Sequence, residues 1–333
     1  MNKRGLAVVW IACAVSLTST GLVRAQGEDR YEIVQVQDGV YSAAAYSPRS
    51  GSHRTVFLVT EDGIVLADPI SVSFSEWLKS EIDERFGVPV RYVLYSHHHW
   101  DHASGGAVFA DTATFVSHEG MATALAAPLP ANLRSRDANG NGLLHRSEAT
   151  RGYAARFDDV DVNRDDNLSG AEINVDIRPP DLLYSERMTV ALGGQSVWLL
   201  HPNPAHSDDM TVLYFPQQRV GFAVDFANVR LMPGELYHYS LDHYESAVET
   251  VLALDIDHFV PGHGEVGDGE DLADYLVFLQ DLQRDVSAAI ENGLTEQQAE
   301  ESVQLAEYSD WQLYGERRPG VVTSAYSILM NTP

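Results

Sequence analysis

Residues 96–102 read SHHHWDH, which places four imidazoles and one carboxylate within a single short stretch. The stretch directly follows an apolar run that predicts a buried strand. In extended backbone, side chains two residues apart project to the same side, so His97, His99 and Asp101 are expected to converge. This density of nitrogen and oxygen donors points to a metal site.

Further candidate ligands extend this cluster. His102 is expected to reach it from the other side, after a turn into a helix, whereas His98 faces away and is not expected to bind. Three more candidates each lie just past the end of a predicted strand: His206, Asp225 and His263. Open α/β sheets place their binding sites at the carboxyl ends of strands. Imidazoles and carboxylates together suit a borderline cation such as zinc.

The remaining pattern predicts an α/β protein with two sheets and outer helices, because strand runs are followed by strands with helices between them. Strands are expected at 31–46 (as a hairpin), 55–60, 64–67, 91–95, 112–117, 182–190, 196–200, 210–215, 220–224 and 258–260. Helices are expected at 74–86, 242–254 and 272–290. Residues 291–333 are expected to form a C-terminal helical extension.

These motifs resemble the metallo-β-lactamase superfamily, and the resemblance covers about residues 31–290 apart from an insertion. It implies an αββα sandwich, here at 26–290, with metals at one edge of the sheets. It also implies a first metal on His97, His99 and His206, a second on Asp101, His102 and His263, and Asp225 as the bridging ligand. Asp68 matches a position that supports the metal loop in this family.

The resemblance implies a dinuclear zinc hydrolase that acts on a small-molecule ester, lactone, amide or related bond. Two zinc ions lower the pKa of a shared water toward ~7, so that a bridging hydroxide can attack the substrate. Asp101 is the expected catalytic residue, because it would hold the second metal and orient the nucleophile. No Ser-His-Asp triad is apparent from the sequence.

The substrate is left open by the sequence. A β-lactamase is an alternative, although the bridging Asp225 departs from the β-lactamase subclass with this histidine motif and resembles glyoxalase II-like and lactonase enzymes. Arg230 is a candidate for holding a substrate carboxylate. Tyr237 and His238 are candidates for the border of the pocket.

An EF-hand-like insertion is predicted at 128–180, where strand patterns give way to Asp, Asn and Gly. Residues 137–148 read DANGNGLLHRSE and match the twelve-residue EF-hand calcium loop, and residues 161–172 match it a second time. The expected calcium ligands are Asp137, Asn139, Asn141, Leu143 (through its carbonyl) and Glu148, then Asp161, Asn163, Asp165, Asn167 and Glu172. One or two calcium ions are therefore expected as additional cofactors.

The two loops are not equivalent, because Asp166 stands where the first loop has the turn glycine Gly142. The first loop is expected to bind calcium more tightly. The short spacing between the loops leaves room for one shared helix, as in the compact, dockerin-like EF-hand pairs that this segment resembles. Two alternatives stay open: an acidic surface loop without metal, and a calcium-dependent module that binds a protein partner while the zinc centre is secondary.

The N-terminus is expected to be an export signal over residues 1–25. A basic start precedes the apolar run 5–23, and the small-residue pattern at 23–25 resembles a cleavage site. A membrane anchor is less favoured because several Ser and Thr residues interrupt the run. We therefore expect a periplasmic or secreted protein, without stable membrane association after cleavage.

The net charge argues against two classes of partner, and the cysteine count argues against thiolate metal ligands. The formal net charge of −26 makes nucleic acid and anionic membranes poor partners, because both are themselves negatively charged. The only cysteine, Cys13, lies in the expected signal. A mature chain without it has neither a disulfide nor a thiolate metal ligand.

Overall fold

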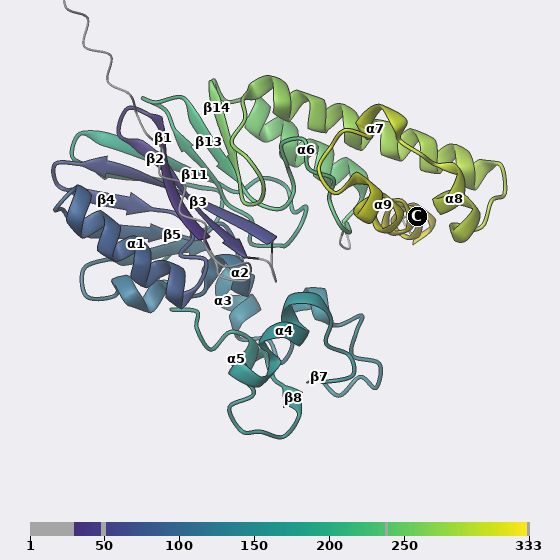
Figure 1. Ribbon diagram of the computed structural model, residues 1–333, viewed down its shortest axis with the longest axis horizontal. Helices are drawn as coiled ribbons and strands as arrows, with labels where there is room; N and C mark the ends of the chain where they lie inside the picture. Colours follow the sequence, from purple (N-terminus) through teal and green to yellow (C-terminus); the bar gives the residue numbers. More distant parts are fainter. Residues whose placement is uncertain (1–29, 48–50, 237–238, 332–333) are drawn as a thin grey trace, which may run out of the picture.

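The computed structural model describes residues 30–47, 51–236 and 239–331, in which two sheets pack face to face between outer helices (Figure 1). The first sheet contains β1 (Arg30–Gln37), β2 (Val40–Ser47), β3 (Gly51–Thr60), β4 (Gly63–Leu66), β5 (Val90–Leu94), β6 (Thr114–His118) and β9 (Leu182–Tyr184), in that order. The second contains β10 (Arg187–Leu192), β11 (Gln195–Leu200), β12 (Val212–Phe215), β13 (Val220–Ala223) and β14 (His258–Pro261), also in that order. The fold is therefore the expected αββα arrangement.

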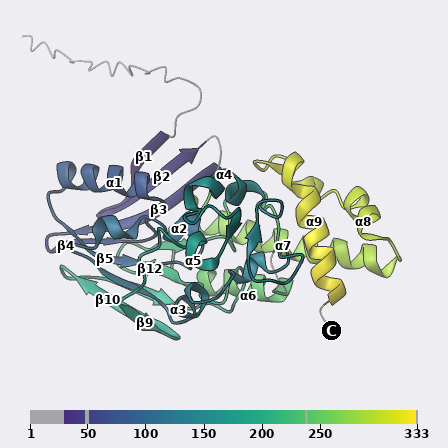
Figure 2. The same ribbon diagram turned by 90° about the horizontal axis from the view of Figure 1, so that it is seen from below.

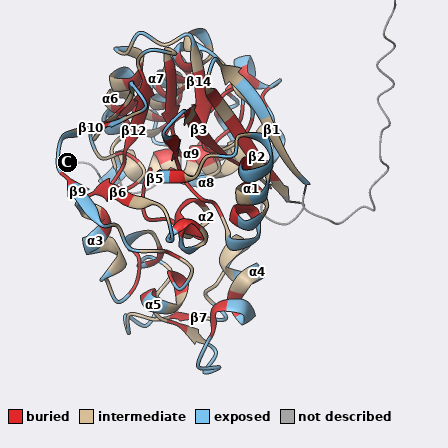
Figure 3. Ribbon diagram, turned by 90° about the vertical axis from the view of Figure 1, so that its left-hand side faces the viewer, coloured by how far each residue is buried: buried red, intermediate tan, exposed pale blue. Residues whose placement is uncertain are grey.

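The two sheets meet through apolar side chains that alternate along their strands, as the two-residue period of a strand requires. Val56 and Leu58 of β3 face the same buried cluster as Val197 and Leu199 of β11. Full burial of each such side chain stabilises the fold by roughly 1.5–3 kcal/mol. In Figure 3 the strands in the middle of the sheets are mostly buried, whereas β1 and β9 at the ends of the first sheet carry exposed residues.

The outer face of the first sheet is covered by α1 (Val72–Arg85), with α2 (Trp100–Ala103), the 3-10 helix η1 (Gly106–Phe109) and α3 (Gly120–Leu125) nearby. The side chain of Ser71 caps the start of α1 by accepting a hydrogen bond from the Phe74 amide. Phe74, Leu78 and Ile82 recur every four residues and are buried, so one face of the helix packs on the sheet.

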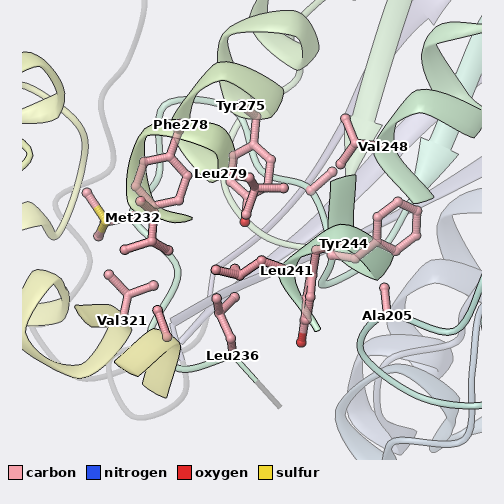
Figure 4. Packing of buried hydrophobic residues seen from close by; sticks show 14 of the residues in the cluster. Ala205, Met232, Leu236, Leu241, Tyr244, Val248, Tyr275, Phe278, Leu279 and Val321 are labelled. Carbon is pink, nitrogen blue, oxygen red and sulfur yellow. The ribbon is translucent and has the colours of Figure 1, made fainter. Parts of the chain in front are cut away.

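The second sheet is covered by α6 (Leu241–Leu252) and α7 (Gly269–Glu291), and the chain then continues through α8 (Glu296–Ser302), η3 (Ala306–Tyr308) and α9 (Tyr314–Asn331). Figure 4 shows Tyr275 and Phe278 of α7 packed near Met232 and Val321. The C-terminal helices therefore share a hydrophobic core with the second sheet. Among the described residues, no helix is long and apolar enough to cross a membrane.

One predicted strand is divided in the structure. The run at 182–190 was expected to be continuous, but β9 and β10 belong to different sheets. Leu182 pairs with Val116 of β6 in the first sheet, whereas Arg187 pairs with Leu200 of β11 in the second. The expectation was wrong because an apolar run reports burial and not the neighbour with which each residue pairs.

The inserted segment forms a small unit beside α2 and α3 (Figure 1). It contains η2 (Ala131–Leu133), β7 (Leu144–His145), α4 (Arg151–Val160), β8 (Asn167–Leu168) and α5 (Gly170–Ile173). Leu144 and Leu168 pair across β7 and β8 and belong to a buried cluster with Phe157 of α4. The segment therefore has its own core, and one helix joins the two loops.

The insertion also contacts the metal-binding loop. The Arg156 guanidinium of α4 lies 4.3 Å from the centre of the Trp100 ring, and Tyr153 packs against the same ring at 6.0 Å. Trp100 stands between two of the candidate ligands, His99 and Asp101. A side chain on Gly152 would approach the Trp100 ring to 2.8 Å, which explains the glycine at this point of close packing.

Candidate metal centre

The backbone changes direction inside the histidine motif. After β5 the chain bends at Ser96 and His98, His99 is extended as the residue before α2, and the backbone becomes helical at Trp100. The motif is therefore not a regular strand, although His97 and His99 still meet in one donor group. Asp101 lies in the first turn of the helix, so it faces a different group of side chains from His97 and His99.

Three distant ligands reach the same edge from the second sheet. His206 lies in the loop between β11 and β12, Asp225 follows β13 and His263 follows β14. The parallel pairing of β13 with β14 brings the carboxyl ends of both strands together. Asp225 has a φ of 67°, a left-handed conformation that aspartate adopts more readily than most residues.

A first group of donors consists of His97, His99, His206 and Asp225, with one donor atom from each within 4.8 Å of the others. His206 Nε2 lies 2.9 Å from His99 Nδ1 and 3.2 Å from Asp225 Oδ2. His97 Nε2 lies 3.4 Å from the same carboxylate oxygen. These separations match donors arranged around one small cation, because zinc–nitrogen bonds are about 2.0–2.1 Å long.

A second group consists of His102, His263 and Asp225. His102 Nε2 lies 3.2 Å from His263 Nε2 and 3.5 Å from Asp225 Oδ1. His263 Nε2 lies 3.0 Å from the same oxygen. Asp101 Oδ2 is 4.0 Å from His102 Nε2, but its carboxylate groups with His53 and His263 and not with His102 and Asp225.

Asp225 joins the two groups through different oxygens. Its Oδ2 atom faces His97 and His206, and its Oδ1 atom faces His102 and His263. A carboxylate that presents one oxygen to each of two donor groups is suited to bridging two cations.

The charges of these groups fit a cation as well. Burial lowers the pKa of His206 to about 3 and that of His99 well below its usual range, so both imidazoles are neutral and keep a lone pair. Burial opposes a charge on His102, yet the carboxylates of Asp225 and Asp101 raise the pKa of His102 to about 9. The proton on His102 therefore offsets the negative charge of Asp225 and Asp101, which a bound metal ion would offset in its place.

Several outer contacts orient the candidate ligands. Asp68 is fully buried and accepts hydrogen bonds from the Ser96 amide at 2.8 Å and the Ser96 hydroxyl at 2.6 Å. The Ser96 hydroxyl lies 2.9 Å from His97 Nδ1, and Asp68 lies 3.6 Å from His102 Nδ1.

His263 Nδ1 lies 2.7 Å from the carbonyl oxygen of Ser52 and can donate to it, which leaves Nε2 free to bind. Such outer contacts fix the tautomer and direction of metal-binding imidazoles.

Residues expected to stand outside the centre, or at its border, are placed as follows. His98 is directed to Asp209, with Nδ1 and Oδ1 2.9 Å apart, and it does not belong to either donor group. Arg230 was a candidate for holding a substrate carboxylate. It is half-exposed, and its guanidinium forms an ion pair with the carboxylate of Asp310 in the same chain. Tyr237 and His238 lie outside the described residues.

The two loops of the insertion repeat the same local geometry. Asp137 accepts hydrogen bonds from the amides of Asn141 and Gly142, and Asp161 accepts them from Asp165 and Asp166. Glu148 accepts from Ala138 and His145, which closes the first loop. Asp166 has a φ of 60°, the conformation that Gly142 adopts at 77°.

His53 is a residue near the centre that the sequence did not predict. It lies on β3, is 5% exposed, and places Nε2 3.3 Å from Asp101 Oδ2. His53, Asp101 and His263 form a third group of donors within 4.8 Å of one another. A single histidine in a strand carries no motif, so no local signal could have identified it.

Comparisons with known proteins identify the family and the fold. The family model of the metallo-beta-lactamase superfamily matches residues 52–263. A curated relative, 2,4-dinitroanisole O-demethylase subunit alpha from Nocardioides sp. (strain JS1661), is 26% identical over 220 residues, which cover 64% of this chain and 53% of that protein. The chain thus spans about half the length of this relative.

A solved structure, a metallo-beta-lactamase from Pontibacter korlensis, is similar with a TM-score of 0.55 at 21% identity. The match covers 75% of this chain and 99% of that one, and at this identity it bears on the fold alone. The family match includes β3, the histidine motif and every candidate ligand through His263. The chain therefore belongs to the metallo-beta-lactamase superfamily.

Proposed function

We propose that the protein is a dinuclear zinc hydrolase of small molecules. The observation that carries this proposal is the position of Asp225, whose two carboxylate oxygens face two separate groups of histidines. His97, His99 and His206 would hold the first ion, and Asp101, His102 and His263 the second. Nitrogen and oxygen donors in this number suit zinc.

Zinc ions held at these residues would lower the pKa of a shared water toward ~7 and polarise the substrate oxygen. The chain itself supplies orientation and charge. Burial raises the pKa of Asp101, but His102 and His53 together hold it well below its usual range, so Asp101 is a carboxylate at neutral pH. Asp101 can therefore accept a hydrogen bond from the attacking nucleophile and keep it directed toward the substrate.

A protein nucleophile is not supported by the contacts of the buried serines near the centre. The Ser96 hydroxyl lies between Asp68 and His97, and the Ser207 hydroxyl donates to Asp209, which also binds His98. A nucleophilic triad requires the imidazole between the serine and the aspartate. Ser207, Asp209 and His98 lack that order. His97 does lie between Ser96 and Asp225, but Ser96 is fully buried and its hydroxyl donates to Asp68 at 2.6 Å.

Hydrolysis is therefore expected to depend on metal and not on a covalent intermediate. Chelation should abolish turnover of a panel of esters, lactones, amides and cephalosporins, and added zinc should restore it. The panel should include an aryl methyl ether, because the curated relative is named as an O-demethylase. Preferential turnover of cephalosporins would favour the β-lactamase alternative, and an acyl group trapped on a serine would refute the metal-dependent mechanism.

We further propose that the inserted loops bind calcium. The repeated aspartate-to-amide contacts and the left-handed residue at the sixth place of each loop support this, because EF-hand loops turn sharply at that place to bring their ligands together. A calcium-dependent binding module remains the alternative. A zinc-loaded protein that turns over no member of the panel, yet captures a partner only with calcium, would favour it.

Export from the cytoplasm is proposed from the sequence of residues 1–25. We expect the mature protein to begin near Gln26. N-terminal sequencing of protein recovered from the periplasm or the medium tests this, and an intact Met1 in that fraction would contradict it.

A further inference from the structure

We propose that His53 is a positioning residue of the second metal site, which it serves by holding the Asp101 carboxylate in place. The inference rests on the proposed dinuclear function. His53 Nε2 lies 3.3 Å from Asp101 Oδ2, and the His53 side chain is almost fully buried. The residue is 48 positions away from Asp101 in sequence and reaches it from a different element.

The location of His53 distinguishes it from the expected ligands. His53 shares a donor group with Asp101 and His263. The other second-site group consists of His102, Asp225 and His263 and does not include His53. Its ring lies 4.7 Å from that of His263 and 5.8 Å from that of His102. His53 therefore flanks the centre on the side of Asp101 and His263.

The strand that carries His53 also holds the His263 loop. The Ser52 carbonyl oxygen lies 2.7 Å from His263 Nδ1, and the Ser52 hydroxyl accepts from the Gly264 amide at 3.1 Å. Buried Arg54 donates through Nε to the Gly264 carbonyl at 2.9 Å, and its amide donates to the Gly262 carbonyl at 2.7 Å. Ser52 and His53 thus contact His263 and Asp101, and the next residue of β3, Arg54, holds the glycines on either side of His263.

The chemistry follows from this arrangement. Asp101 lies on the short helix α2, and its carboxylate can rotate about the side-chain bonds unless a neighbouring group holds it. A hydrogen bond from His53 Nε2 to Oδ2 removes that freedom before the metal binds. Loss of such an outer contact typically lowers metal affinity by about 10- to 100-fold.

The test compares His53→Ala with His53→Gln, which keeps an N–H donor, and with His118→Ala as a control. His118 is another buried histidine, but its ring stacks on His201 and it belongs to none of the donor groups. The measurements are zinc affinity at each site by chelator competition, the absorption spectrum of the cobalt-substituted protein, and the melting temperature of the metal-free protein.

We expect His53→Ala to lower second-site affinity by about 10- to 100-fold while the first site is unchanged. His53→Gln should recover most of the affinity and the wild-type cobalt spectrum, and His118→Ala should bind both ions normally. Unchanged affinity and spectrum in folded His53→Ala would overturn the proposal. A changed cobalt spectrum that His53→Gln does not restore would also overturn it, because the imidazole would then be a ligand itself. A wild-type protein that never binds a second ion would instead refute the dinuclear function.

Discussion

Replacing Asp225 with alanine is expected to remove the metal ion at the second site and to lower hydrolysis by about 10²- to 10³-fold, the scale of losing one group that stabilises transition-state charge. Asp225 faces His102 and His263 through one oxygen and His97 and His206 through the other. Without it, the second site loses its shared anionic ligand, while the first retains its three imidazoles.

Elemental analysis of purified Asp225→Ala should therefore show close to one zinc per chain, against two in the unmodified protein. Asp255→Ala is a suitable control, because Asp255 is an exposed aspartate whose charge pairs with Arg219 on the surface. Two tightly bound ions in Asp225→Ala would contradict the bridging role. A native protein that carries one iron and no zinc would contradict the dinuclear mechanism as a whole.

Calcium is expected to stabilise the zinc-loaded protein by about 3 kcal/mol when its concentration is a hundredfold above the dissociation constant. The physical reason is the repulsion among the negative charges at 158–166. Arg146 offsets part of it by pairing with Asp158 at 2.6 Å and with Asp166 at 2.9 Å. A cation in the loops would reduce the remaining repulsion. Calorimetric titration and the melting temperature of calcium-stripped protein measure the effect.

The first loop should bind more tightly than the second. Gly142 adopts its left-handed conformation without a steric clash, whereas the Asp166 side chain disfavours the same conformation, although aspartate tolerates it better than most residues. Glu148→Gln should weaken calcium binding by about ten- to a hundredfold, the equivalent of one contact to a charged group at ~1.5–3 kcal/mol.

Zinc content should stay nearly intact in Glu148→Gln, because the proposed zinc ligands lie outside the insertion even though α4 packs on Trp100. Glu249→Gln, on the exposed face of α6, provides the control. If calcium produces neither binding heat nor a higher melting temperature, the loops are only an acidic surface segment.

The sandwich architecture was predictable because its strands and helices follow local periodicities. The predicted strand at 91–95 is β5, and the predicted helix at 272–290 is α7. The boundary between sheets was not predictable in the same way. The run at 182–190 has strand-forming residues on both sides of Ser185 and Glu186, and only pairing with β6 and β11 assigns its two halves to different sheets.

For the metal site, too, some features could be predicted from the sequence and others could not. The motif at 96–102 and the residues at strand ends are recognisable from sequence, because side-chain direction in a strand and the turn into a helix depend on neighbouring residues. The two predicted calcium loops are recognisable for the same reason, since their expected ligands lie within twelve residues of one another. The sequence alone therefore determined which residues were candidates.

Only the tertiary structure decided how those candidates are grouped. It directed the two oxygens of Asp225 to different histidines, and it brought His53 of β3 to Asp101. It also joined Arg54 to Gly264 across 210 residues. Such contacts depend on sheet order, strand register and the packing of one sheet on the other, which are set by the whole core and leave no signal in the residues beside them.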